Sequence, residues 1–389
     1  MNPTKLEKNE IQLYQKKIFN KSIFARARKR TFHSIAKVII GKEKLDRLVE
    51  LNEKKLILKK MGLSHNIINK TKKRITYVGW LAHDNLGDEA LYQANSHIFK
   101  PYLLIPEIGY PQYSKITLFG GGTFFPVWGL KIIQNKYNYA YGVGVKNPSF
   151  WGKFETSDID KLKNFNFRYI GVRDISSKYL LKDWGLDSEV IGDPCFLLDT
   201  KIIRPINRNM KKIAINVGSD GLLWGGNELR VYKEVVKLCK ILKKNDYDPI
   251  LIPFWKNNIN DIQKISKITK TPIFQNWRNT QETINLINSC GIMIGERLHS
   301  IIFSALTHTP FISIEYRPKC RDFAETMGFE KYVIRTDKIK SQIIISLLKD
   351  LLNDWENMNK KLIKKVNYYS EKLDKFAKII IKDIEINLG

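Results

Sequence analysis

The chain has 389 residues, of which 43% are hydrophobic, and a formal net charge of +27 at pH 7. This length suffices for two domains with hydrophobic cores, and the composition excludes a disordered chain. No apolar run approaches the ~18 residues of a transmembrane helix and the N-terminus is polar, so we expect a cytoplasmic protein. The cysteines are too widely spaced for a disulfide framework or a zinc cluster: Cys195, Cys239, Cys290 and Cys320.

The positive charge is concentrated at the N-terminus. Residues 1–74 contain 21 Lys and Arg against 6 Asp and Glu, so 21 − 6 = +15 of the total lies there. Between residues 21 and 40, basic side chains are mixed with apolar ones such as Ile23 and Phe32 at helical spacing. The pattern predicts a basic, mainly helical arm over 1–73 that binds an anionic membrane surface. The alternatives are nucleic acid, which we do not expect because no recognition motif accompanies the charge, and a solvated helix.

From Arg74 onward, short apolar runs alternate with amphipathic helical patterns, as in parallel α/β units. The alternation occurs twice, which predicts an α/β fold with two Rossmann-like domains, 74–200 and 201–336, facing a cleft. Charged helices over 337–389 are expected to pack back on the core. The expected strands are 75–81, 116–119, 139–145, 169–172, 189–191, 213–217, 250–253, 273–274, 292–294 and 311–314. The expected helices are 88–99, 176–184, 227–244, 260–269, 281–289, 296–306 and 321–327.

The most informative segment is IGERLHSIIFSAL at residues 294–306. An apolar strand pattern over 291–294 leads into it and a helix pattern follows, so Arg297 and His299 lie after a strand end, where α/β sheets bind ligands. A fixed cation beside a titratable imidazole suits an anionic substrate whose reaction moves a proton. Alternatively, Arg297 pairs with Glu296 or another carboxylate and His299 caps a helix.

Two strand ends in the first half carry patterns that suit ligand binding. NLGDEAL at residues 85–91 opens a helix, where Asn85 or Asp88 can cap the turn and exposed amides can hold an anion. The segment lacks GxGxxG and gives no support for a dinucleotide. Three glycines follow the next strand, and their amides can approach a ligand without side-chain obstruction. These are Gly120, Gly121 and Gly122.

Basic or aromatic side chains follow three more strand ends: Lys146, Arg173, Tyr316 and Lys319. Arg173 is either a second cation for the substrate or a salt-bridge partner of Asp174 or Asp193. Lys319 precedes a helix and is well placed to bind a phosphate.

In this order, the motifs resemble those of the polysaccharide pyruvyl transferase family over residues 75–330. The shared motifs are NLGDEAL at 85–91, the glycine turn at 120–122, GVRD at 171–174, GDP at 192–194, ERLH at 296–299, and Tyr316 followed by Lys319. The chain departs from the family pattern at Thr123, where many members extend the glycine run. It departs again at Lys146, in a stretch that is usually rich in glycine and proline.

The resemblance implies a GT-B-like fold and transfer of pyruvate from phosphoenolpyruvate to a sugar, usually as a cyclic ketal. The family's catalytic arginine and histidine fall on Arg297 and His299, and its donor-binding arginine on Arg173. These cations and Lys319 would orient the donor, while His299 would protonate its enol carbon. One of three side chains near the first strand would deprotonate the acceptor: His83, Asp84 or Glu89.

We therefore expect a transferase of capsule, exopolysaccharide or cell-wall polymer assembly, which needs no cofactor and no metal. Its acceptor would be a saccharide, lipid-linked and met at the inner face of the cell membrane. The expected substrate-binding residues are Asn85, Asp88, Gly120, Gly121, Gly122, Lys146, Arg173, Tyr316 and Lys319. A GT-B glycosyltransferase that uses a nucleotide sugar, and a non-catalytic scaffold of the assembly complex, are the alternatives.

The basic arm gives a first testable prediction. Deletion of residues 1–70 should release the protein from anionic liposomes, because it removes both the apolar insertion and the electrostatic attraction. Liposome binding by the full-length chain should weaken as salt rises to about 0.5 M, since screening shortens the range of the attraction. Cosedimentation checks both effects, and equal sedimentation of the two chains would assign the arm to folding or to a protein partner.

Overall fold

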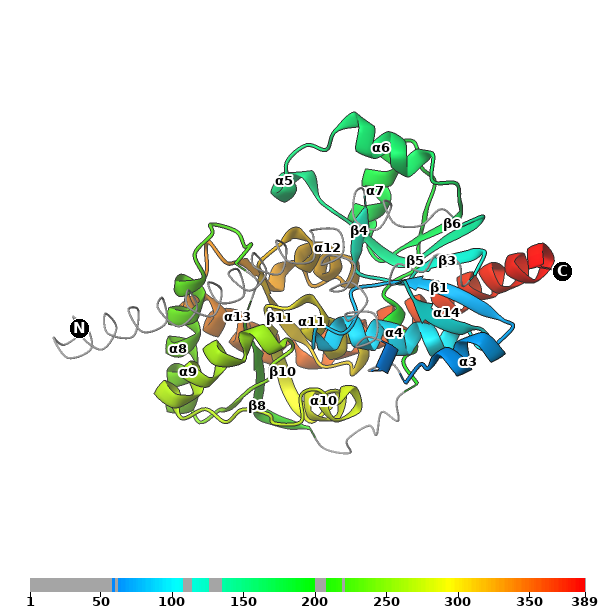
Figure 1. Ribbon diagram of the computed structural model, residues 1–389. Coiled ribbons are helices and arrows are strands. Elements are labelled where there is room, and N and C mark those ends of the chain that lie inside the picture. Colours follow the sequence, from blue (N-terminus) through cyan, green and yellow to red (C-terminus); the bar gives the residue numbers. More distant parts are fainter. Residues whose placement is uncertain are drawn as a thin grey trace, which may run out of the picture. The chain divides into compact units, whose positions relative to one another are not determined.

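The computed structural model describes residues 58–59, 62–107, 114–125, 135–199, 208–218 and 221–388 (Figure 1). The chain divides into two compact units, 1–59 and 60–389. The membrane-binding segment predicted within the basic arm lies outside the described residues. The described part of the arm includes a short helix, α3 (His65–Lys70), which Ser64 caps. Among the described helices, none is both long enough and apolar enough to span a membrane.

The first sheet contains seven parallel strands, in the order β2-β1-β3-β5-β6-β7 with β4 paired to β5. Their interiors are buried on both faces, as expected of parallel strands covered by helices. The strands are β1 (Arg74–Val78), β2 (Leu103–Pro106), β3 (Ile116–Phe119), β4 (Thr123–Phe125), β5 (Tyr137–Val145), β6 (Phe167–Val172) and β7 (Glu189–Val190). The helices between and after them are α4 (Leu86–Ile98), α5 (Pro148–Trp151), α6 (Thr156–Lys163), α7 (Ile175–Asp183) and the 3-10 helix η2 (Pro194–Leu197).

The second sheet contains five parallel strands in the order β12-β11-β10-β8-β9. They are β8 (Asn209–Asn216), β9 (Asp248–Leu251), β10 (Cys290–Gly295), β11 (Phe311–Glu315) and β12 (Val333–Arg335). The intervening helices are α8 (Glu228–Lys244), η3 (Lys256–Asn258), α9 (Ile259–Thr269), α10 (Thr280–Asn288), α11 (Leu298–Leu306), α12 (Pro318–Met327) and η4 (Glu330–Tyr332). The two parallel sheets confirm the predicted α/β fold class with two Rossmann-like sheets (Figure 1).

The element predictions differ from the structure in a few places. The strand expected at 273–274 is wrong, because Ile273 forms only an isolated bridge with Leu251. Three short strands, β2, β4 and β12, were not expected, since their apolar runs are too brief to give a periodic signal. The helix expected at 296–306 begins at Leu298, because Glu296 and Arg297 still belong to the turn.

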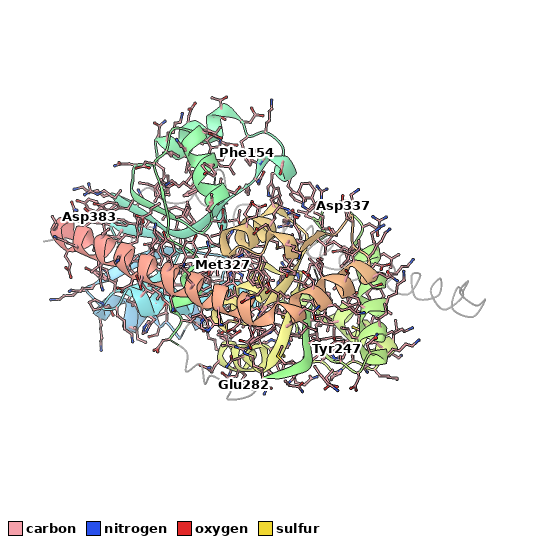
Figure 2. The ribbon with its side chains drawn as sticks, turned by 180° about the vertical axis from the view of Figure 1, so that it is seen from behind. Phe154, Tyr247, Glu282, Met327, Asp337 and Asp383 are labelled. Carbon is pink, nitrogen blue, oxygen red and sulfur yellow. The ribbon has the colours of Figure 1, made fainter. Side chains whose placement is uncertain are left out.

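Two C-terminal helices follow, α13 (Ser341–Asn353) and α14 (Trp355–Leu388). Figure 2 shows α14 from behind, with Asp383 near its C-terminal end. Its first residue reaches the second sheet, where Trp355 Nε1 donates to the carbonyl of Gly291 at 2.8 Å. Its later turns reach the first sheet, where Tyr139 Oη donates to Asp383 Oδ2 at 2.6 Å. A single long helix therefore connects both sheets.

A second connection lies at the carboxyl ends of the strands. The amide of Leu86 donates to the carbonyl of Phe254 at 2.9 Å, and the amide of Lys256 donates to that of Asp84 at 3.1 Å. Trp255 Nε1 donates to the carbonyl of His83 at 3.1 Å. These contacts hold the N-terminus of α4, from the first half, against the segment that follows β9 in the second half.

Candidate functional site

The turn between β10 and α11 is fixed by a side chain at the end of the neighbouring strand β8. The amide of Arg297 donates to Asn216 Oδ1 at 2.9 Å, and the amide of Glu296 donates to the Asn216 carbonyl at 3.1 Å. Glu296 Oε2 in turn accepts from the amide of Gly218 at 2.6 Å. One asparagine thus sets the direction in which the ERLH turn leaves the sheet.

The Arg297 side chain is only 8% exposed and packs against amide and aromatic groups. Its Nη2 lies 3.3 Å from Asn258 Oδ1, and its guanidinium carbon lies 4.4 Å from the centre of the Trp255 ring. Its Nε is buried without a hydrogen-bond partner in the described part of the chain. These contacts hold the guanidinium in place and leave donor capacity for an added anion.

The His299 imidazole lies partly buried in the first turn of α11, against the N-terminus of α4. A Cβ at Gly87 would lie 2.0 Å from His299 Nδ1, so only glycine permits this approach. On the other side of the ring, Nε2 is buried and has no hydrogen-bond partner among the described residues. The sequence placed His299 only at a strand end, whereas the structure encloses its imidazole between α11 and the N-terminus of α4.

Three cations act on this imidazole. Burial lowers the pKa of His299 well below 6.5, and Arg173, then Lys319, then Arg297 lower it further. Each cation disfavours the protonated ring, and the weak screening of a buried site strengthens the repulsion. His299 is therefore neutral at pH 7 in the free protein, and an anion bound among the cations would favour its protonation.

Arg173 follows β6 and is only 1% exposed. Its Nε lies 3.3 Å from Asp174 Oδ2, so the salt bridge considered as an alternative is present. Asp174 also caps α7 by accepting from the amide of Ser177 at 2.8 Å. The guanidinium nevertheless lowers the pKa of His299 as well, and its Nη1 has no hydrogen-bond partner in the described ranges. The structure brings Arg173 into the cluster, and donor contact stays a prediction.

Lys319 and Tyr316 come from the segment between β11 and α12. Tyr316 is 1% exposed, with its ring 5.1 Å from Lys319 Nζ and 5.9 Å from the Arg297 guanidinium carbon. The phenol ring thus packs between cations of the site. Its role in this structure is to position Lys319 and Arg297, and direct substrate contact by Tyr316 stays a prediction.

Asn85 and Asp88 lie at the start of α4. Asn85 caps the helix by accepting from the amide of Gly87 at 3.2 Å. Burial raises the pKa of Asp88 to about 7, although Lys319 and Arg297 partly oppose this rise. A carboxyl group with this pKa, beside two cations, can exchange a proton near neutral pH.

The glycine run at 120–122 is packed against protein side chains. The Gly120 carbonyl accepts from Tyr77 Oη at 2.7 Å, and the Gly122 carbonyl accepts from the amide of Gly144 at 2.7 Å. Gly121 has φ +101°, and a Cβ there would lie 2.7 Å from Leu91 Cδ2. The run therefore joins β3 to β5 at close quarters, and donation of its amides to a substrate stays a prediction.

Lys146 lies at the end of β5, apart from His299. Its Nζ is 5.3 Å from the centre of the Trp151 ring. Lys146 and Trp151 line a pocket together with Thr123, Arg317 and Lys319. Lys319 and Arg297 both lie over the Tyr316 ring, so this pocket adjoins the imidazole cluster.

The sequence did not assign Asp193 and Cys195, at the start of η2, to the site. Asp193 Oδ2 is buried and lacks a hydrogen-bond partner among the described residues. One ligand atom from each of Asp193, Cys195 and His299 lies within 4.8 Å of the others, as in a metal site. The three cations around His299 would repel a divalent ion bound there. That the protein needs no metal stays a prediction. The GDP motif at 192–194 was the signal that could have placed Asp193 here.

Comparison with protein families gives one match. The model of the family described as polysaccharide pyruvyl transferase matches residues 29–318. None of the curated proteins compared with the chain is significantly similar to it.

Several solved structures are similar to the chain at a distance. An uncharacterized protein from Klebsiella pneumoniae is 16% identical, with 74% of this chain and 98% of that chain covered and a TM-score of 0.41. A UDP-GlcNAc 2-epimerase from Neisseria meningitidis is 12% identical, with 80% and 99% covered and a TM-score of 0.46. A glycosyltransferase from Rickettsia africae is 13% identical, with 81% and 99% covered and a TM-score of 0.46. These similarities are too distant to bear on activity.

The displaced pKa values predict opposite effects of pH on stability in two variants. As pH falls below 6.5, unfolded His299 takes up a proton that the folded imidazole does not, so the wild type should lose stability relative to His299→Gln. As pH rises from 3.8 through about 7, the unfolded state ionises Asp88 before the folded state does. The wild type should therefore lose stability relative to Asp88→Asn in that direction. Urea unfolding at about pH 5 and about pH 7.5 measures both differences. If the stability of the wild type relative to each variant changed in the same direction between pH 5 and pH 7.5 for both variants, the assignment would be contradicted.

Proposed function

The chain belongs to the polysaccharide pyruvyl transferase family, and on this premise we propose that it transfers the pyruvyl group of phosphoenolpyruvate to two hydroxyls of a saccharide, forming a ketal. The observation that carries the proposal is that Arg173, Arg297 and Lys319 all act electrostatically on His299, with Arg297 and Lys319 over the same Tyr316 ring. Phosphoenolpyruvate bears a phosphate and a carboxylate, and several fixed cations match its charge. It is a substrate, so the reaction needs no resident cofactor.

Donor binding would prepare His299 for proton transfer. The free imidazole is neutral because burial and three cations disfavour its charged form. A multiply charged donor among those cations would offset the repulsion and raise the imidazole pKa toward the working pH. His299 would then take up a proton and deliver it to the methylene carbon of the donor, which makes the central carbon electrophilic.

The acceptor hydroxyls would react in two steps. The first hydroxyl attacks the central carbon and loses its proton to a carboxylate; Asp88, with a pKa of about 7, is best matched to accept it. Asp84, considered from the sequence, lies 3.4 Å from Lys256 Nζ in an ion pair. The second hydroxyl then bonds to the same carbon and gives its proton to the departing phosphate, while the bond between that carbon and the phosphate oxygen breaks. This step releases phosphate and closes the ketal.

We further propose that the acceptor belongs to a cell-surface polysaccharide or its lipid-linked precursor, met at the inner face of the cell membrane through the basic arm. Phosphate release from phosphoenolpyruvate in the presence of candidate glycans tests the donor assignment. Consumption of a nucleotide sugar instead would favour a glycosyltransferase, and consumption of neither donor would favour a scaffold.

The role of His299 predicts the behaviour of its variants. His299→Ala and His299→Gln should each reduce phosphate release by roughly 10² to 10⁴, the usual cost of losing a general acid. His97→Gln is the matched control, because His97 is solvent-exposed at the far end of α4 and its side chain is 42% exposed. Near-normal turnover of His299→Gln would remove the proposed proton donor.

The two arginines predict a defect in donor binding even when charge is kept. Arg297→Lys and Arg173→Lys should each raise the phosphoenolpyruvate concentration needed for half-saturation, because lysine cannot reproduce the paired donors of a guanidinium. Arg278→Lys, at an exposed position, should behave as wild type. Steady-state titrations decide this, with thermal unfolding of each variant as a check on folding. If the phosphoenolpyruvate concentration for half-saturation were unchanged in both variants, the two arginines would have a structural role instead.

A further inference from the structure

A pocket adjoins the imidazole cluster, and of the residues that line it only Lys319 takes part in the chemistry proposed above. One wall comes from the start of β4, the end of β5 and the segment from there through α5; the other comes from the start of α12. All four elements are labelled in Figure 1. The side chains that matter here are those of Thr123, Lys146, Trp151, Arg317 and Lys319.

An aromatic ring with two cations beside it forms the centre of this pocket. The Trp151 side chain is 38% exposed, which is high for an indole. Lys146 Nζ lies 5.3 Å from its ring centre and the Arg317 guanidinium carbon lies 5.1 Å from it. The Arg317 guanidinium is also held by a hydrogen bond, in which its Nε donates to the carbonyl of Leu222 at 2.9 Å. A cation–π contact does not remove the charge of the cation. The ring and its cations therefore form one surface that is both apolar and positive.

The balance of charge in the pocket favours a bound anion. Burial lowers the pKa of Lys146, Arg317 lowers it further, and Asp158 partly opposes the shift. The helix α12 begins at Pro318, and its N-cap residue Arg317 makes no side-chain capping hydrogen bond. The positive end of this helix therefore adds to the charge of Lys146, Arg317 and Lys319. A phosphate or carboxylate placed between these groups would relieve their mutual repulsion.

We propose that this pocket is the acceptor subsite, and that it selects a saccharide with an anionic group beside the hydroxyls that are modified. The indole can cover the apolar face of a sugar ring, while Lys146 and Arg317 bind its phosphate, diphosphate or carboxylate. The inference rests on the proposed function, since it deepens the assignment of the acceptor.

The position of the pocket supports the assignment. Lys319 belongs to both sites, which places the acceptor next to the donor cations. The two positions that depart from the family pattern, Thr123 and Lys146, both line this pocket.

Isothermal titration calorimetry on the full-length chain tests the proposal. Phosphoenolpyruvate is titrated first; then inorganic diphosphate, glucuronate and neutral glucose are each titrated in its saturating presence. The wild type should bind one of the two anions and should bind glucose more weakly than that anion. Binding of diphosphate would identify a phosphate group as the recognised anion, and binding of glucuronate a carboxylate.

Two variants and a matched control locate the binding. Lys146→Gln and Arg317→Gln should each lower the affinity for the anion about tenfold, equivalent to ~1.4 kcal/mol, and leave the affinity for phosphoenolpyruvate unchanged. Lys153→Gln makes the same charge change at an exposed position two residues from Trp151, and should have no effect. Thermal unfolding confirms that each variant is folded.

Three results would overturn the proposed subsite. Neither anion binds the wild type, or the anion binds only in competition with phosphoenolpyruvate, or Lys146→Gln and Lys153→Gln bind the anion with the same affinity. Failure of the proposed function looks different. In that case phosphoenolpyruvate does not bind. Binding of an anion by Lys153→Gln but not by Lys146→Gln would still support the anionic subsite.

Discussion

Electrostatic repulsion between three cations and one imidazole is the constraint on which this site depends. Arg173, Arg297 and Lys319 follow three strand ends in two different sheets, and all three act on His299. Burial makes the repulsion stronger, since the protein interior screens charge less than water does. The consequence is a neutral imidazole whose protonation depends on a bound anion. Under the proposed function, recognition of the anionic donor and protonation of His299 would therefore be one electrostatic event.

The surroundings hold these cations in place without pairing every one of them with a carboxylate. Arg297 lies against Trp255 and Asn258, and Lys319 lies beside the Tyr316 ring. Aromatic faces and amides stabilise a cation by a modest amount and leave its charge in place. Full ion pairs would compete with the substrate for the same donors. Asp88, whose pKa burial raises to about 7, adds a titratable carboxyl rather than a permanent counterion.

The site exists only because the two sheets are joined next to it. The loop before α4 contains two residues in left-handed backbone conformation, Ala82 (φ 65°) and Asp84 (φ 49°), which are uncommon outside glycine. This loop contacts Trp255 through an indole hydrogen bond and Lys256 through a backbone hydrogen bond. The same junction presses Gly87 against His299 and places Trp255 over Arg297. Strained backbone next to a reactive group is the pattern expected where geometry serves binding.

The sequence alone determined the two α/β sheets, the strand ends that carry Arg173, Arg297 and Lys319, and the ERLH turn. Those features follow from apolar periodicity and from residues placed where parallel strands end, which are local properties of the chain. The tertiary structure decided which of these residues meet. It brought Asp193 and Cys195 to His299, gave Tyr316 and the glycine run packing roles, and separated Lys146 and Trp151 into a neighbouring pocket. Burial, which sets the pKa values of His299 and Asp88, arises only when distant segments pack together, and no local pattern of residues specifies it.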